Sequence, residues 1–112
     1  MKKIIFSIFL LFALFNIRAE MSPTDSLKAR LEIVSAKEKV DVLYELSKAY
    51  WQVDPKLSLD YGESAREIAE RLDYLPGKAL ALNNIGVGYY YLGDGKTALK
   101  YLKKSLELRR KS

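Results

Sequence analysis

The chain has 112 residues, of which 49% are apolar and 29% charged, enough for one small globular domain. It contains no cysteine and no histidine. Disulfide frameworks, thiolate nucleophiles, histidine acid–base catalysis and the common zinc ligand sets are therefore excluded. We accordingly expect a protein that is not an enzyme and that needs no cofactor or metal.

The N-terminal twenty residues have the layout of a secretory signal peptide. Lys2 and Lys3 form a basic start, residues 4–15 form a predominantly apolar run, and Ala19 offers a small residue for cleavage. A membrane-spanning helix needs about 20 apolar residues, so cleavage is favoured over anchoring. Because Arg18 beside Ala19 makes the cleavage site imperfect, an uncleaved membrane anchor is the alternative. The sequence thus predicts an exported protein, either periplasmic or secreted.

The net charge falls when the expected signal peptide, residues 1–19, is removed. The full chain carries a formal charge of +5, from 19 basic and 14 acidic residues. Removal of the signal peptide takes three basic residues and leaves 16 against 14, a net charge of +2. Such a small excess does not favour nucleic acid as a partner.

Residues 20–35 are expected to form a leading segment with a short helix, followed by two helix pairs over residues 36–112. The predicted helices cover about 36–52, 55–72, 77–92 and 95–110. The first helix of each pair has apolar or small residues at positions i, i+3, i+4 and i+7, which is typical of one helix face. In the first pair these residues are Leu43, Leu46, Ser47 and Tyr50. Their counterparts in the second pair, each 39 positions later, are Leu82, Ile85, Gly86 and Tyr89. The chain therefore contains a repeat.

Short turns are predicted within each helix pair. Asp54 is expected to cap the second helix, with Pro55 at its first position. In the second pair, Gly93 is expected to stop one helix and Asp94 to cap the next. The stretch DYLPGK, residues 73–78, is expected to form the loop between the pairs, because proline and glycine punctuate helices. Turns this short require antiparallel packing within a pair.

Small residues are predicted where the two helices of a pair cross most closely. Gly86 faces Ala98 in the second pair, and Ser47 faces Ser58 in the first. Glycine inside a helix costs about 1 kcal/mol relative to alanine, so close packing is the expected reason for Gly86. Gly88 has no comparably clear partner in the pattern.

The spacing of these residues resembles the tetratricopeptide repeat. The resemblance rests on Leu82, Ile85-Gly86, Tyr89, Gly93, Ala98, Leu102 and Ser105. It covers residues 79–112 well and residues 40–72 more loosely, with a unit of about 40 residues that is similar to the exported sensor regions of bacterial signalling proteins. The resemblance implies an all-α fold, in which antiparallel helix pairs stack as a short α-solenoid, a fragment of a right-handed superhelix.

In such proteins the first helix of each pair lines a concave groove that holds a peptide or a partner helix. By this resemblance, the partner-binding residues are Tyr44, Lys48, Trp51, Asn83, Asn84, Val87, Tyr90 and Tyr91. Tyrosine and tryptophan are common interface anchors, although Tyr90 and Tyr91 could equally pack only against an adjacent helix. We therefore expect an extracytoplasmic protein–protein interaction module with no catalytic residues.

Other interpretations stay open from the sequence. The chain could be a truncated or remnant sensory input region of a membrane-bound signalling protein, a histidine kinase or a transcriptional regulator. Leucines on the last helix have no following repeat to cover them, which predicts self-association or marginal stability. An enzyme that uses Ser47, Ser58 or Ser105 as a nucleophile is the weakest alternative, because small-residue packing explains these serines better.

Overall fold

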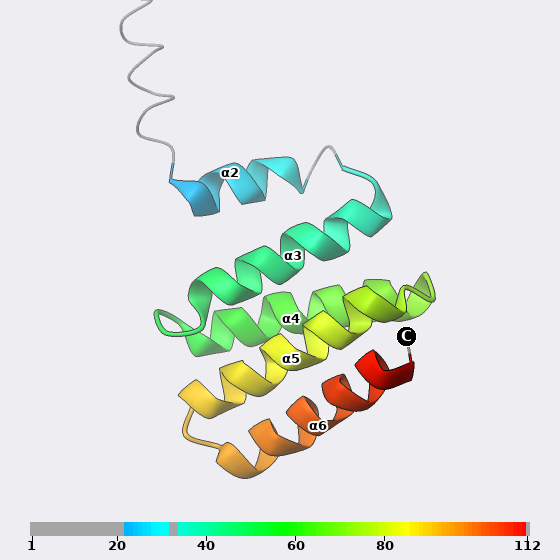
Figure 1. Ribbon diagram of the computed structural model, residues 1–112. Helices are drawn as coiled ribbons and strands as arrows, with labels where there is room; N and C mark the ends of the chain where they lie inside the picture. The colour runs from blue at the N-terminus through cyan, green and yellow to red at the C-terminus, as the bar shows by residue number, and fades with distance from the viewer. Residues whose placement is uncertain (1–21, 32–33, 112) are drawn as a thin grey trace, which may run out of the picture.

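The computed structural model describes residues 22–31 and 34–111, where all the regular structure is helical. The helices are α2 (Pro23–Arg30), α3 (Ala36–Tyr50), α4 (Pro55–Arg71), α5 (Leu75–Tyr91) and α6 (Gly95–Lys111). Figure 1 shows them stacked side by side in chain order as an elongated array. The predicted signal peptide, residues 1–19, lies outside the described residues.

Each helix packs against the next one along the chain, and α3 also contacts α5 (Figure 1). The first helices of the two pairs therefore touch each other directly. No contact joins the second helices, α4 and α6, within the described part of the chain. This arrangement of antiparallel pairs confirms the predicted all-α solenoid.

Local sequence signals set where the helices begin. The Asp54 carboxylate accepts a hydrogen bond from the Leu57 backbone N–H at 3.2 Å, and Asp94 accepts one from Thr97 at 3.1 Å. Ser35 caps α3 in the same way. A cap of this kind is worth about 1 kcal/mol, because it satisfies a backbone donor at the helix start. The predicted caps of α4 and α6 are therefore confirmed.

The connection between the two pairs is shorter than the sequence suggests. Helix α5 begins at Leu75, so Pro76 and Gly77 lie in its first turn and not in the loop. Proline is tolerated there because backbone N–H groups in the first turn of a helix have no intrahelical acceptor, so the N–H that proline lacks costs no hydrogen bond. Gly93 ends the same helix with a φ of +85°, a left-handed conformation that glycine adopts at little cost.

The crossing within each pair is built from small residues, as predicted. The Ser47 hydroxyl donates to the Ser58 carbonyl at 2.8 Å, and the Ser58 hydroxyl donates to the Ser47 carbonyl at 2.7 Å. Both serines are fully buried. In the second pair, a Cβ on Gly86 would lie 2.9 Å from the Leu102 Cγ and 3.1 Å from the Ala98 carbonyl oxygen. Only glycine fits this crossing without movement of its neighbours.

Stacked tyrosines repeat with the same period at the end of each pair. Tyr50 stacks on Tyr61 with ring centroids 5.8 Å apart, and Tyr89 stacks on Tyr101 at 5.6 Å. Tyr89 is half-buried, and burial raises the pKa of its phenol above the ordinary value. Such aromatic pairs are worth about 0.5–1.5 kcal/mol beyond the area that they bury. Each pair of helices is thus closed by an aromatic contact near its turn.

Candidate functional site

The predicted groove residues form one row on α3 and a matching row on α5. The row on α3 lies toward the end of the helix and consists of Tyr44, Lys48 and Trp51. Their spacing of i, i+4 and i+7 places them on one helix face. The residues 39 positions later are Asn83, Val87 and Tyr90, at the same spacing on α5. Because α3 and α5 are in contact, the two rows belong to neighbouring helices.

The two rows differ in how much side chain they expose. Tyr44 and Trp51 are half-buried on the first row, whereas Lys48 is exposed. On the second row Asn83 and Val87 are half-buried, and Tyr90 is 65% exposed. On these two rows the most accessible aromatic side chain therefore lies at the C-terminal end of α5.

Tyr90 and Tyr91 form an aromatic pair at this end of α5. Their ring centroids lie 5.3 Å apart in an edge-to-face arrangement, and Tyr91 is 40% exposed. The Gln52 side-chain amide donates a hydrogen bond of 2.9 Å to the Tyr91 hydroxyl. Gln52 holds the position equivalent to Tyr91 in the repeat, 39 residues earlier, but sequence reasoning did not single it out. This bond fixes Tyr91 across the repeats and leaves Tyr90 open.

Asn84 differs from the expectation that it contributes to an open groove. Its side chain is fully buried, and its Nδ2 donates a hydrogen bond of 2.9 Å to the Tyr44 backbone carbonyl. It therefore joins α5 to α3 inside the protein. Its Oδ1 and the Trp51 Nε1 are buried without a hydrogen-bond partner among the described residues. An unpaired buried polar atom costs about 1–3 kcal/mol, so the seam between α3 and α5 has polar groups that the fold leaves unsatisfied.

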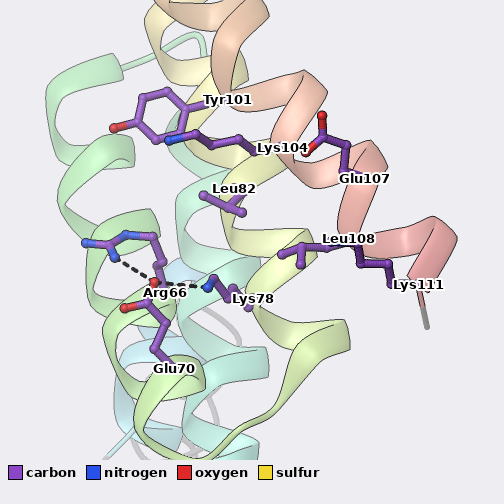
Figure 2. Close-up of a pocket in the computed structure, with 9 residues that line it drawn as sticks. All are labelled: Arg66, Glu70, Lys78, Leu82, Tyr101, Lys104, Glu107, Leu108 and Lys111. Atoms are coloured by element: carbon purple, nitrogen blue, oxygen red, sulfur yellow. Dashed lines mark hydrogen bonds and ion pairs between the residues drawn. The ribbon is translucent and has the colours of Figure 1, made fainter.

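A second concave feature, which sequence reasoning missed, lies between α4, α5 and α6 (Figure 2). It is a cleft of about 480 Å³. Figure 2 shows charged side chains of α4 and α6 on its two sides, with Leu82 and Leu108 between them. The lining residues are Arg66, Glu70, Lys78, Leu82, Tyr101, Lys104, Glu107, Leu108 and Lys111.

Ion pairs occupy the α4 side of this cleft. Arg66 binds Glu70 at 2.9 Å, and Lys78 of α5 binds Glu70 at 3.4 Å (Figure 2). Arg66 also binds Glu63 at 2.7 Å. Burial acts to raise the pKa of Glu70, but the hydrogen bonds and charges of Arg66 and Lys78 hold it below its ordinary value. The i, i+3 and i, i+4 spacing of Glu63, Arg66 and Glu70 was the sequence signal for this network. Glu70 thus joins α4 to α5 electrostatically.

The candidate serine nucleophiles are part of the packing. Ser47 and Ser58 donate to each other's carbonyl groups, and the Ser105 hydroxyl donates to the Ala79 carbonyl at 2.6 Å. All three are buried, which suits helix contacts and not attack on a substrate. Within residues 22–31 and 34–111, no cluster of acidic side chains could hold a metal ion. None of the helices described has the length and apolar character needed to cross a membrane.

Comparison with known families agrees with this architecture. The family model described as the tetratricopeptide repeat matches residues 41–111, which include most of α3 and all of α4, α5 and α6. Searches of the curated proteins and of the solved structures found no match. Proteins with these repeats generally mediate protein–protein interactions, and their fold is generally not enzymatic. The helix pairs, their small-residue crossings and the family match together show that this chain belongs to the tetratricopeptide repeat family.

Proposed function

We propose that this protein is an extracytoplasmic interaction module that binds a peptide or a partner helix along the surface formed by α3 and α5. The observation that supports this best is the 65% exposure of Tyr90 at the end of the row on α5, with Tyr91 beside it at 40%. Tyrosine at an open position offers a large contact area and loses little rotamer freedom on binding. This exposed pair is the expected anchor point.

The chemistry of the rows suggests what the partner carries. Trp51, Val87 and Tyr90 supply apolar and aromatic contact area, and Lys48 supplies an exposed positive charge. Interfaces combine such a core with a polar rim. We therefore infer a partner segment with an aromatic or aliphatic anchor and a carboxylate within reach of Lys48.

The proposed location rests on the N-terminal segment. Lys2, Lys3 and the apolar run of residues 4–15 are the features that support export. A fusion of the chain to a reporter enzyme that is active only outside the cytoplasm tests this. Activity of the fusion, lost when residues 1–19 are deleted, supports export, and activity that is insensitive to the deletion refutes it.

Site-specific crosslinking tests the binding surface. A photoreactive amino acid placed at Tyr90 should capture a discrete partner in cells, and the captured band should weaken when Lys48→Glu is added. The same photoreactive residue at Glu67, an exposed position on α4, is the matched control. Equal capture from both positions, or capture from neither, would contradict the proposal.

A further inference from the structure

Helix α6 exposes an apolar stripe on the side away from α5. Leu99 is 53% exposed and Leu106 is 50% exposed, and their spacing of seven residues places them on one helix face. Leu102, by contrast, packs against the Gly86 backbone of α5. Half of each of the two outer leucines thus remains in contact with solvent.

Comparison with the equivalent helix of the first pair, α4, indicates what kind of element would pack on this stripe. The residue 40 positions before Leu99 is Leu59 of α4, and α5 packs directly over it. A Cβ on Gly88 of α5 would lie 2.8 Å from the Leu59 Cδ2, which shows how closely the two helices approach. The surface of α4 that α5 covers is therefore the surface that α6 presents uncovered. Its natural occupant is an α-helix.

The charges around this surface are reversed between α4 and α6. At the covered surface, Glu70 of α4 forms an ion pair with Lys78 of α5 at 3.4 Å (Figure 2). The residue 40 positions after Glu70 is Arg110, and the one 40 positions after Glu63 is Lys103. A helix that packs on α6 as α5 packs on α4 therefore meets the Arg110 cation where α5 meets the Glu70 carboxylate. It needs a carboxylate at the position that Lys78 holds in α5.

The same charges oppose a second copy of this chain as the occupant. The residue of α3 equivalent to Lys78 is Lys39, so an α3 helix stacked on α6 would place Lys39 against Arg110. Two α6 helices packed together would each bring seven basic residues and one acidic residue. Like charges in contact destabilise such an arrangement.

Side-chain size specifies the partner further. Gly62 of α4 sits so close to α5 that a Cβ there would lie 3.1 Å from the Ile85 Cγ1. Leu102 holds the equivalent position on α6. A helix on α6 therefore needs a residue smaller than isoleucine at this point, seven positions after the carboxylate.

We propose that the outer face of α6, formed by Leu99, Leu106, Lys103 and Arg110, binds an amphipathic helix of an acidic partner protein. The carboxylate in the first turn of that helix faces Arg110, and a small residue seven positions later faces Leu102. This surface lies on α6 and does not include the rows on α3 and α5. Its test is therefore independent of the groove proposed above.

Two peptides that copy α5 probe this surface. Both carry residues 75–91 with Ile85→Ala, and one also carries Lys78→Glu. Each is titrated into the full chain and into its Arg110→Glu variant at low ionic strength, with binding followed by calorimetry. A carboxylate near a helix N-terminus favours the helix by itself, but this effect cancels when the four affinities are compared as a cycle.

We expect the full chain to prefer the glutamate peptide, and Arg110→Glu to prefer the lysine peptide, by about two- to fivefold each. The preference should shrink in high salt. Replacement of both Leu99 and Leu106 by alanine should weaken binding of either peptide by about tenfold, because apolar area is lost. Lys100→Glu is the control, since it makes the same charge change elsewhere on α6 and should leave the preference unchanged.

Four results would overturn the proposal. One is no binding of either peptide to a chain whose circular dichroism shows it to be folded. Another is that the preference between the two peptides is the same for the full chain and for its Arg110→Glu variant. A third is undiminished binding of the peptides by the variant in which both Leu99 and Leu106 are alanine. A dimer of the chain in sedimentation experiments that the same alanine changes disperse would assign the surface to a second copy, and would also overturn it.

Discussion

The packing explanation of Gly86 predicts opposite effects for the same substitution at two glycines. In Gly86→Ala the new Cβ would lie 2.9 Å from the Leu102 Cγ and 3.1 Å from the Ala98 carbonyl oxygen. The carbonyl belongs to the backbone of α6 and cannot turn aside as a flexible side chain can. In Gly95→Ala the new Cβ meets nothing within 4 Å, at the start of α6.

The expected magnitudes follow from two competing contributions. Alanine in place of glycine favours a helix by up to about 1 kcal/mol. Insertion of an extra carbon into a packed contact costs about 1–3 kcal/mol. Gly86→Ala should therefore lower the free energy of unfolding by about 1 kcal/mol, and Gly95→Ala should raise it by a few tenths to about 1 kcal/mol.

Thermal and urea unfolding followed by circular dichroism measure both changes. For a domain of this size, 1 kcal/mol corresponds to a shift in Tm of about 4–8 °C. The urea midpoint should move without a change in the slope of the transition, which would show that native stability itself is affected. Stabilisation by both substitutions would refute the account of Gly86 as a residue required by close packing.

Three further predictions concern the contacts between helices. Ser58→Ala should destabilise the protein by about 1 kcal/mol, as measured by urea unfolding. Adding Ser47→Ala to this variant should cost less than a further ~1 kcal/mol, because the two hydroxyls bond to each other's helices and their contributions are coupled. Glu70→Gln should cost less than about 1 kcal/mol at pH 7, because the ion pairs are partly exposed. The pKa of Glu70 is held below its ordinary 4.5, so the stability that its ion pairs contribute is complete above that pH and is lost as the pH falls further. The free energies of unfolding of this variant and of the parent should therefore converge in acid. Asn84→Ala should destabilise by about 1–3 kcal/mol, measured by thermal unfolding, because the half-buried Tyr44 carbonyl loses the donor that the buried Asn84 supplies, and no change would show that this bond is dispensable.

The helix pairs were readable from the sequence because their signals are local. The i, i+3, i+4 and i+7 pattern around Leu46 and Ile85 requires only that one helix face be apolar. Asp54 and Asp94 cap helices through hydrogen bonds to backbone groups three residues away. The stop at Gly93 depends on its own backbone conformation. Repetition of these short-range signals at a period of about 40 residues was sufficient to predict the fold class.

Contacts between the repeats were harder to predict. Gly88 had no partner in the sequence pattern, and the structure places it against Leu59 of the preceding pair. Asn84 has the spacing of a groove residue, but it is fully buried and bonded to the Tyr44 carbonyl. These outcomes depend on how far each helix is rotated about its axis when it stacks, which no single helix specifies.

The sequence by itself determined the helices, their caps and the small-residue crossings, because each depends on residues within one helix or within one pair. Only the tertiary structure decided which side chains stay exposed between repeats. Tyr90 remains open while Gln52 ties down Tyr91, and Glu70 joins α4 to Lys78 of α5. These contacts join residues of different repeats, and they form only when the repeats stack at one angle and one register.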